Sequence, residues 1–397
     1  MAQAIDALAE LVGAEAARRI VEFRRDMHQH PEIGMDTARA ADKIEAFLQT
    51  LPVEQVHRFA GNGVCAVIRG KKDGPMIGLR ADTDALPIQE ETSVAWKSAI
   101  DKCAHLCGHD GHTAGLLAAA TLLAQTRDFA GSVVLIFQPG EEGWAGADKM
   151  IKDGLFERYP CREVFAIHGA PSRPLGTIAV REGAMTASVD IAYMTVEGQG
   201  GHGARPQETI DPMPAAAELI LALQTIVARN INPADSAVVS CCFVQAGDPL
   251  APTVIPQRVN LSATIRTHSP RVRDKIEARF NEITQGIGTV FGGEVKLDYQ
   301  RRYPPQINDP ALVRAILPAL QSVYGEAGVD TKFAPSMGGE DFAFMSEKVP
   351  GVYMQVGLGD EGHTAQLHNP GFDFNDLGLA YAARTFAAIV QERLPLN

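Results

Sequence analysis

The sequence predicts an α/β fold: a mixed, largely parallel sheet flanked by helices, into which an α+β ferredoxin-like domain is inserted. In the first part of the 397-residue chain, apolar strand-like runs alternate with helix-like segments. From about residue 186 to 300 the pattern becomes strand–helix–strand–strand–helix–strand, the split βαβ arrangement. The first alternation then resumes. We therefore expect one domain formed by residues 1–185 and 301–397, and a second at residues 186–300.

Hydrophobic periodicity locates the elements of the first domain. Helical segments carry apolar residues three and four apart, whereas buried strands are short uninterrupted apolar runs. The run Val133–Phe137 ends at a Gln-Pro pair, and the run Val164–Ile167 is followed by a histidine. The expected helices span 37–49 and about 112–126, and the expected strands span 63–69, 76–81, 133–137 and 164–167.

The inserted domain is indicated by one strand with a polar face and by two helices. Residues 258–266 alternate between polar and apolar side chains, as in a strand that is buried on one face only. One helix is expected to start with Asp211 as its N-cap and Pro212 at the first helical position. A second helix is expected from about Val272 to Val290.

Composition and charge exclude some classes of binding partner for this chain. The net charge is −12 and the isoelectric point is near 5.4, which argues against binding to nucleic acid or to an anionic membrane surface. We see no signal peptide and no apolar run of about 18 residues, so nothing is expected to span a membrane. Six cysteines in 397 residues are sparse, which favours a reducing cytoplasm. These features predict a cytoplasmic enzyme for small molecules.

The strongest chemical signal is a cluster of polar residues between His105 and His112. It contains three histidines, one cysteine and one aspartate. Cys107 and His109 are two apart, so on an extended segment both side chains point to the same side. Thiolate and imidazole are ligands for Zn²⁺, Co²⁺ or Mn²⁺. The alternative is a polar loop that caps the helix expected at 112, but the whole cluster favours metal.

Two adjacent carboxylates, Glu141 and Glu142, follow the strand that ends at Phe137. Open α/β sheets bind ligands at the carboxyl ends of their strands. A carboxylate pair at such a place is costly unless a cation balances it. One carboxylate can bind metal while the other accepts a proton from metal-bound water. A solvated acidic turn is the alternative interpretation of this pair.

Two further histidines are weaker candidates. His168 ends an apolar strand, which suits a ligand, although such a histidine taken alone is more often buried and hydrogen-bonded in the core. His368 lies in a Leu-His-Asn-Pro segment near the C-terminus and could close a site across the sheet. Taken alone it would be a histidine of a surface loop.

The segment Gly198–Gly203 matches the dinucleotide pattern G-x-G-x-x-G. A helix should open at once after that motif, but Ala204-Arg205-Pro206 intervenes and helix signals begin only near residue 211. The context therefore argues against a nucleotide-binding oxidoreductase. A glycine turn that holds His202 out from a strand is the better interpretation.

Taken together, these motifs resemble the M20 family of metallo-amidohydrolases, and within it the branch of hippurate hydrolases, N-acyl-amino-acid hydrolases and plant auxin-conjugate hydrolases. The resemblance covers nearly the whole chain, because the matching motifs are spread along it in order. The matching blocks are residues 25–32, 79–87, the Cys107 cluster, 138–142, 200–206, 337–342 and 367–370.

The resemblance implies metal-dependent hydrolysis of the amide bond of an N-acyl amino acid or a related small amide. Glu141 would be the general base, and later the acid toward the leaving nitrogen. Two divalent ions per subunit are implied, Zn²⁺ or Mn²⁺, with Co²⁺ or Ni²⁺ as alternatives. The implied ligands are Cys107, His109, Glu142, His168 and His368, with the Cys107 thiolate bridging the two ions.

The resemblance also gives roles to residues outside this ligand set. The inserted domain would be a lid and dimerisation domain of a homodimer or higher oligomer, and His202 would act in the partner subunit's site. Arg266 would bind the substrate carboxylate, and Thr253 stands where relatives commonly have an asparagine that contacts the substrate. Asp84 and Asp110 would orient the metal ligands.

Two other functions stay open. A dipeptidase or carboxypeptidase could use the same fold, and peptide substrates would separate it from an N-acyl-amino-acid hydrolase. A non-catalytic metal-binding protein is the other alternative. Loss of Glu141 or of a ligand would favour it, and the sequence keeps both.

Overall fold

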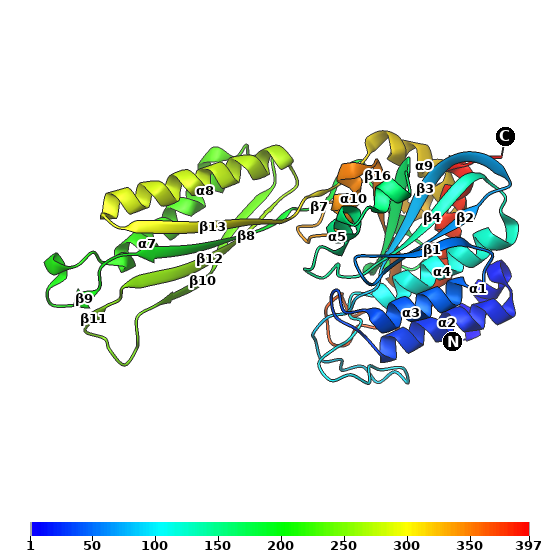
Figure 1. Ribbon diagram of the computed structural model, residues 1–397, viewed down its shortest axis with the longest axis horizontal. Helices are drawn as coiled ribbons and strands as arrows, with labels where there is room; N and C mark the ends of the chain where they lie inside the picture. Colours follow the sequence, from blue (N-terminus) through cyan, green and yellow to red (C-terminus); the bar gives the residue numbers. More distant parts are fainter. Residues whose placement is uncertain (1, 397) are drawn as a thin grey trace. The chain divides into compact units, whose positions relative to one another are not determined.

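The computed structural model describes residues 2–396, which divide into two compact units (Figure 1). Unit 1 consists of the described residues up to Gly183, together with Ile307–Ala334 and the residues from Asp341 onward. Unit 2 consists of Ala184–Gln306 and the short segment Pro335–Glu340. Sequence analysis placed the two domain boundaries at 185/186 and 300/301, and the structure places them at 183/184 and 306/307. Sequence analysis did not predict that residues 335–340 belong with unit 2.

Unit 1 is built on an eight-stranded sheet of order β1-β2-β4-β3-β5-β16-β6-β15. The central pairings β4–β3, β3–β5 and β5–β16 are parallel, whereas β1–β2, β2–β4 and β16–β6 are antiparallel. The predicted fold class, a mixed and largely parallel sheet with flanking helices, is confirmed. Its strands are β1 (Glu54–Phe59), β2 (Gly63–Arg69), β3 (Lys72–Asp82), β4 (Ala130–Gln138), β5 (Glu163–Pro174), β6 (Ile178–Ala179), β15 (Val329–Asp330) and β16 (Gly351–Gly359).

The helices of unit 1 bury the sheet. Helices α4 and α11 pack against each other and α2 packs against α4, while α5 and α10 form a second packed pair. The all-apolar centre of β4 is fully buried, as expected of a strand covered on both faces. These helices are α1 (Ala2–Val12), α2 (Ala14–Gln29), α3 (Ala38–Leu48), α4 (His109–Thr126), α5 (Gly146–Lys152), α6 (Leu155–Arg158), α9 (Pro310–Tyr324), α10 (Phe342–Lys348) and α11 (Gly378–Arg393).

Two helical regions differ from the sequence prediction. Helices α1 and α2 were not predicted, although α2 buries Ile20, Val21 and Met27 at amphipathic spacing. Helix α4 begins at His109 rather than near 112, because Gly108 adopts a left-handed conformation (φ 89°) and lets the first turn start at once. The earlier start places His109 in the first turn of α4.

Unit 2 has its own four-stranded sheet of order β10-β12-β8-β13, in which every pairing is antiparallel. The predicted strand–helix–strand–strand–helix–strand order is confirmed, and so is the alternation of β12, whose apolar side chains are buried. The elements are β8 (Val189–Glu197), β9 (Gly201–His202), α7 (Pro212–Thr225), β10 (Ala237–Ala246), β11 (Val254–Ile255), β12 (Arg258–Thr267), α8 (Pro270–Phe291) and β13 (Glu294–Tyr303). Two short strands, β7 (Gly183–Thr186) and β14 (Gln306–Asn308), lie where the chain passes between the units.

The two helices of unit 2 start at side-chain caps. Asp211 accepts a hydrogen bond from the backbone N–H of Met213 (2.9 Å), with Pro212 at the first helical position as predicted. Ser269 caps α8 in the same way. The separate hydrophobic core beneath this sheet contains Leu219, Leu261 and Phe280. None of the described helices is both long and apolar enough to cross a membrane.

Candidate metal centre

Four segments of unit 1 bring the predicted metal ligands together. Cys107 lies two residues before the start of α4, and Glu142 follows β4 by four residues. His168 lies in β5, opposite Gln355 of β16. His368 lies in the loop between β16 and α11, where its backbone N–H donates to the carbonyl of Leu106 (2.7 Å). This hydrogen bond ties the His368 loop to the segment that carries Cys107.

The five predicted ligands form two groups that share Cys107. One group is Cys107, His109 and His168, and the other is Cys107, Glu142 and His368. Within each group the possible ligand atoms lie within 4.8 Å of one another. The sulfur of Cys107 is 3.4 Å from Nε2 of His168, and Nε2 of His368 is 3.3 Å from Oε1 of Glu142. The geometry therefore offers two adjacent positions for cations with one residue common to both.

The backbone between Cys107 and His109 is not extended, so that part of the prediction is wrong. A strand would have placed the two side chains on the same side through its two-residue period. Here the left-handed Gly108 turns the chain and α4 begins at His109. A side chain at position 108 would strain this conformation, because L-residues rarely adopt φ near 90°. The two side chains still converge, but through a turn into a helix.

The electrostatics of the centre favour positive charge. Burial raises the pKa of the Cys107 thiol well above its usual value, and the neighbouring Glu142 carboxylate raises it further. Burial lowers the pKa of His109, but the Asp82 carboxylate and the Cys107 sulfur raise it, and the net pKa lies well above its usual value. Neighbours that raise the pKa of a buried imidazole report a site with an excess of negative charge. A divalent cation would balance that charge.

The hydrogen bonding of the His109 ring indicates whether the centre suits a metal ion. His109 is fully buried, and neither of its ring nitrogens has a hydrogen-bond partner among the described residues. A buried polar atom without a partner costs about 1–3 kcal/mol. A cation that took the lone pair of one nitrogen would remove this penalty. The thiolate, imidazole and carboxylate donors around it are those that divalent transition metals prefer, so the residues fit a metal.

Asp84 holds the two glutamates through their backbone. Its Oδ1 accepts from the backbone N–H of Glu141 (2.9 Å), and its Oδ2 accepts from that of Glu142 (3.1 Å). The same Oδ1 lies 3.5 Å from Nδ1 of His109. Asp110 lies elsewhere, with its carboxylate against Arg24 and His28 of α2 at 2.9 Å each. Asp84 thus touches the predicted ligands, whereas the ion-pair partners of Asp110 anchor the start of α4 to α2.

Glu141 is buried beside the predicted ligands. It forms a third group with His109 and Glu142, whose possible ligand atoms also lie within 4.8 Å of one another. Its Oε1 accepts from the backbone N–H of Asp341 (3.3 Å). The Asp341 carboxylate accepts in turn from Gln138 (2.7 and 2.8 Å) and from Arg80 (3.0 Å), and all of these groups are buried. Sequence reasoning did not select Asp341 as a residue that holds Glu141.

Sequence reasoning counted His112 in the cluster that favours metal but gave no role of its own to His112 or to Asp82. Oδ1 of Asp82 is 2.6 Å from Nδ1 of His112, and both side chains are buried next to His109. Burial raises the pKa of Asp82, but His109, Arg80 and His112 lower it, and the net pKa lies well below its usual value. The missed signal was helical spacing: His112 is three residues after His109 and shares its face of α4.

The predicted substrate contacts lie in unit 2. His202 is exposed on β9, which pairs with β11 so that His202 is opposite Val254. Thr253, the residue before Val254, accepts a hydrogen bond at its carbonyl from the N–H of Gly203 (2.7 Å). Only a three-residue 3-10 helix, Pro206–Glu208, follows the glycine-rich segment, and the next α-helix, α7, starts at Pro212. The structure thus puts His202 and Thr253 on one two-stranded ribbon.

Arg266 lies on the polar face of β12, as the alternation predicted. Its guanidinium donates to the hydroxyl of Thr264 (2.5 Å) and to the carbonyl of Ile265 (3.0 Å). Partial burial lowers the pKa of Arg266, and the nearby Asp190 carboxylate works against that shift. Asp190 itself forms a buried ion pair with Arg273. The hydrogen-bond acceptors of Arg266 within the described chain are therefore neutral oxygens.

A largely buried cluster of thiol, imidazole and carboxylate at the ends of the central strands of an α/β sheet, with a second carboxylate beside it, is typical of a metal-dependent hydrolase. Comparison with known proteins gives the family: residues 78–392 match Peptidase family M20/M25/M40, and the chain belongs to this family. The chain is 37% identical to an N-acetylcysteine deacetylase of Bacillus subtilis over 94% of this chain and 96% of that protein. It is 36% identical to a hippurate hydrolase of Campylobacter jejuni over 94% and 96% of the two chains.

A solved structure agrees with these relatives. A dinuclear metal-binding peptidase of the M20 family from Bacillus subtilis superposes with a TM-score of 0.82 at 34% identity, covering 95% of this chain and 98% of that one. The resemblance inferred from the motifs is confirmed. The protein is a metal-dependent amidohydrolase of the M20 family.

Proposed function

We propose that the protein hydrolyses the amide bond of small N-acyl amino acids, with Glu141 as the general base. The observation that carries this proposal is the pair of ligand groups that share Cys107, with Glu141 buried beside them. Two of the similar proteins are named for N-acetylcysteine and hippurate, which are both N-acyl amino acids. These names support the substrate class for this chain.

Two divalent cations would be held by the five residues named above, Cys107, His109, Glu142, His168 and His368, with Cys107 common to both. The mixed sulfur, nitrogen and oxygen donors favour Zn²⁺ or Mn²⁺, and Co²⁺ or Ni²⁺ can replace them. When bound, the cations supply Lewis acidity, which polarises the scissile carbonyl and makes a water molecule easier to deprotonate.

The protein's own contribution to the reaction is proton transfer by Glu141. Its carboxylate accepts the proton of the attacking water and then passes that proton to the leaving nitrogen. The hydrogen bond from Asp341 fixes one carboxylate oxygen, and Asp84 fixes the backbone of residues 141 and 142. A base that is held in one orientation needs no reorganisation when the substrate arrives.

Arg266 is the proposed partner of the substrate carboxylate. A guanidinium that is half-buried and hydrogen-bonded to neutral oxygens keeps its capacity to pair with an anion. Thr253 is the proposed second contact from the same unit. This assignment explains why an N-acyl amino acid, which retains a free carboxylate, would be preferred over a neutral amide.

His202 is the proposed donor to the scissile carbonyl, acting from unit 2 as a lid. Its Nδ1 faces the backbone N–H of Ala204 at 3.1 Å. Because a backbone N–H can only donate, Nδ1 is the acceptor and the ring proton is on Nε2. An exposed histidine whose Nε2 carries a proton is suited to donate to a carbonyl oxygen.

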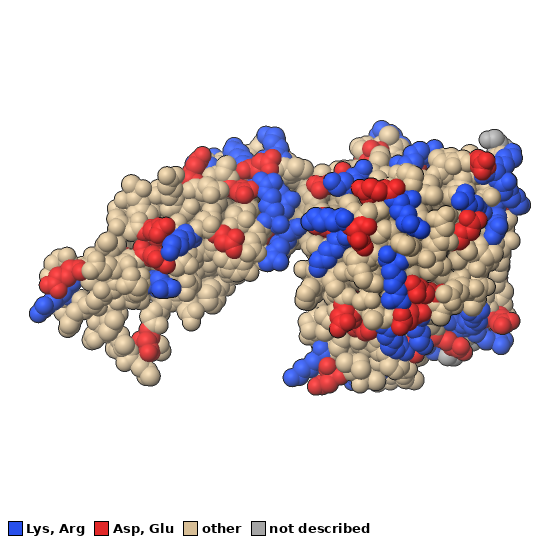
Figure 2. All heavy atoms as spheres, in the orientation of Figure 1, with Lys and Arg blue, Asp and Glu red and all other residues tan. Residues whose placement is uncertain are grey.

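We further propose that unit 2 forms a homodimer with a second copy, so that His202 acts in the partner subunit. Strand β10 is an edge of its sheet and contains no charged residue, and Phe243 and Val244 are 48% and 53% exposed on it. The visible face over β10 is almost free of Lys, Arg, Asp and Glu (Figure 2). An uncharged edge strand with exposed apolar side chains is typical of a strand that pairs with another chain. Light scattering on wild type and Phe243→Asp tests this, and a wild-type monomer would refute it.

A cytoplasmic location and a small-molecule substrate complete the proposal. All six cysteines are free, and four of them are buried, which suits a reducing compartment. A net charge of −12 argues against nucleic acid as a partner.

A dipeptidase or carboxypeptidase activity is the second candidate, because the solved M20 relative is named a peptidase. One screen separates the two. The purified protein is loaded with Zn²⁺, Mn²⁺ or Co²⁺ and offered N-acyl amino acids, their carboxamides and dipeptides. We expect the highest kcat/KM for N-acyl amino acids with a free carboxylate. Faster turnover of dipeptides would assign the protein to the peptidases, and no hydrolysis in any arm would contradict both.

A further inference from the structure

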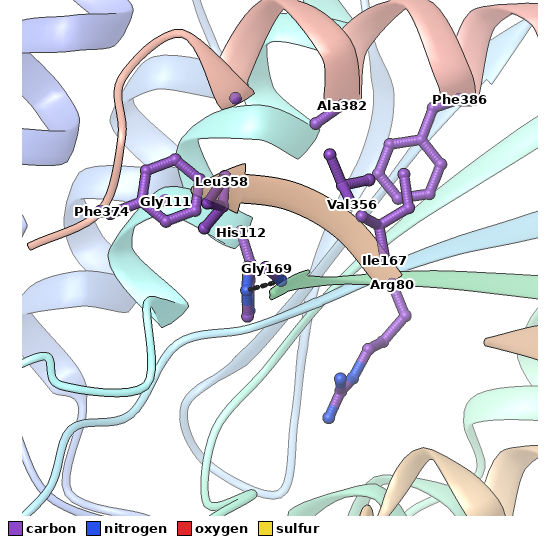
Figure 3. A pocket seen from close by; sticks show the side chains of 11 residues that line it. Arg80, Gly111, His112, Ile167, Gly169, Val356, Leu358, Phe374, Ala382 and Phe386 are labelled. Atoms are coloured by element: carbon purple, nitrogen blue, oxygen red, sulfur yellow. Dashed lines mark hydrogen bonds between the residues drawn. The ribbon is translucent and has the colours of Figure 1, made fainter. Parts of the chain in front are cut away.

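His112 uses both of its ring nitrogens inside the protein. Its Nδ1 is 2.6 Å from Oδ1 of Asp82, and the backbone N–H of Gly169 donates to its Nε2 (2.8 Å). The bond to Gly169 is drawn in Figure 3. Because a backbone N–H can only donate, Nε2 carries no proton and Nδ1–H donates to the carboxylate. The two partners thus fix both the ring orientation and the tautomer of His112.

The far end of this arrangement is the predicted ligand His168. Gly169 is the next residue in β5, and its carbonyl is 2.8 Å from Nδ1 of His168. Nδ1–H of His168 therefore donates to that carbonyl, which leaves the lone pair on Nε2, 3.4 Å from the sulfur of Cys107. Hydrogen bonds thus run from Asp82 through His112 to the N–H of Gly169, and the carbonyl of the same residue holds His168.

The surroundings of these hydrogen bonds are buried and closely packed. Oδ2 of Asp82 accepts from Arg80 (2.7 Å), so the carboxylate is held at both oxygens. A Cβ at position 169 would lie 2.4 Å from Cδ1 of Leu358 and 3.4 Å from Nε2 of His112, so a larger residue there would require the Leu358 side chain to shift. The cavity beside His112 in Figure 3 has a volume of about 10 Å³ and a mostly apolar lining, which leaves room for at most one water. Buried hydrogen bonds of this kind are stronger than exposed ones.

We propose that His112 and Asp82 are positioning residues that act through Gly169 to hold His168 as a metal ligand. The proposal rests on the assignment of His168 as a ligand in the proposed function. His112 lies within 4.8 Å of Asp82 and His109 at its possible ligand atoms, a spacing that would also suit a cation. Both nitrogens of His112 are already bonded to protein groups, so the structure assigns it to support and not to coordination.

Variants of position 112 test the proposal through metal affinity. His112→Asn keeps a donor for Asp82 but has no acceptor that reaches Gly169, whereas His112→Gln extends an amide oxygen toward Gly169. Thr113→Val is the matched control, because it removes a buried hydrogen bond from α4 to the backbone of Asp82 (2.8 Å) without touching Gly169. Affinity for Co²⁺ is measured by competition with a chelator, and the absorption spectrum of the Co²⁺ form is recorded. The thermal midpoint of each metal-free variant reports its fold.

We expect His112→Asn to lose on the order of 10–100-fold in affinity for one of two Co²⁺ ions and to shift the spectrum, as removal of groups that support a ligand does. His112→Gln should lose less, and Thr113→Val should bind both ions like wild type. Asp82→Asn replaces a charged acceptor by a neutral one and should lower the affinity for the same Co²⁺ ion. This variant decides the outcome if His112→Asn does not fold.

Two results would overturn the inference. One is wild-type affinity for both ions in His112→Asn or Asp82→Asn. The other is an equal loss in His112→Asn and Thr113→Val that follows their thermal midpoints, which would assign His112 to general stability. His168→Ala keeps this inference separate from the proposed function. If His168→Ala binds both ions normally, the ligand assignment fails, whereas if it loses one ion and His112→Asn does not, only the positioning role fails.

Discussion

The predicted metal ligands of unit 1 and the predicted substrate contacts of unit 2 differ in how they are held. Cys107 and His109 are 8% and 0% exposed and are built into the junction of a sheet with a helix, and His168 is buried as well, whereas His368 is exposed on a loop. His202 is exposed on a two-residue strand. Groups that bind cations must be desolvated and fixed before the ion arrives. Groups that meet a substrate must stay accessible, and a separate unit can carry them.

The largest effect on kcat is expected from substitution of the adjacent glutamates of unit 1. Comparison of the two variants should separate loss of catalysis from loss of metal binding. Glu141→Gln should keep both ions and lose on the order of 10²–10⁴ in kcat, because an amide cannot accept the proton of water. The matched variant Glu142→Gln should lose metal as well as activity. Metal content by mass spectrometry and turnover are measured on both. A metal-replete Glu141→Gln enzyme with wild-type kcat would place the base elsewhere.

Subunit mixing tests whether unit 2 acts in the partner's site. His202→Ala and Glu141→Gln should each be nearly inactive as homodimers. In a mixed dimer, one site would carry both defects and the other site neither. Because one of the two sites then has its intact base and its intact histidine, activity should return to about half of wild type per dimer. The two variants are refolded together with different tags and the doubly tagged dimer is isolated. Mixed dimers without activity would confine His202 to its own subunit or exclude it from catalysis.

A smaller effect is expected from the carboxylate contact. Arg266→Gln should raise KM for N-acyl amino acids by about 10–100-fold, the value of a charge-assisted hydrogen bond of 1.5–3 kcal/mol. Arg258→Gln is the control, because Arg258 is exposed at the other end of the same strand. With substrate carboxamides the two variants should behave alike. An equal penalty of Arg266→Gln on acids and carboxamides would contradict the assignment.

The smallest effect is expected on the free energy of unfolding, whose pH dependence should report the buried residue His28. Burial lowers the pKa of His28, but Asp110 and Glu90 raise it, and the net pKa is about 9. Because this folded-state value exceeds the ordinary 6.5, the stabilisation is complete below pH 6.5 and is lost as pH rises toward 9. The free energy of unfolding should fall by about 1–3 kcal/mol across that window.

The comparison for this effect is His28→Gln, whose decline should be smaller than that of wild type, as measured by urea unfolding of the metal-free protein. The raised pKa of His109 adds the same decline to both proteins, so the difference between them reports His28. The neighbouring His105 does not obscure the window. Burial lowers its pKa to about 3, so its own contribution is lost only as pH falls below 6.5. A wild-type stability that is flat between pH 6.5 and 9 would show that His28 is not held as a cation.

The sequence was sufficient for the fold class and for the residues that converge on the metal centre. Strand–helix alternation located the sheet, and the two-residue alternation of β12 placed Arg266 on its polar face. The five predicted ligands come from four separate segments, and only motifs matched to a family could link His368 to Cys107 before the structure was seen. Hydrophobic spacing carries no information about such long-range convergence.

Other features could not be read from sequence patterns. The turn at Gly108 depends on a left-handed conformation that leaves no periodic signal. His112 lies in a helix that is buried all round, where a histidine resembles any satisfied core residue. Its role became visible only through the bonds to Asp82 and Gly169, which are 30 and 57 residues away in the chain. Asp341 was not predicted for the same reason: its backbone N–H donates to Glu141, which is 200 residues away in the chain.

The most direct test of the central claim is anomalous diffraction from crystals of the Zn²⁺- or Mn²⁺-loaded protein. The account predicts two metal peaks per chain, each roughly 2.0–2.5 Å from the sulfur of Cys107. One peak should also contact His109 or His168, and the other Glu142 or His368. A single peak, or a peak ligated by Asp82 and His112 in place of Cys107, would contradict it.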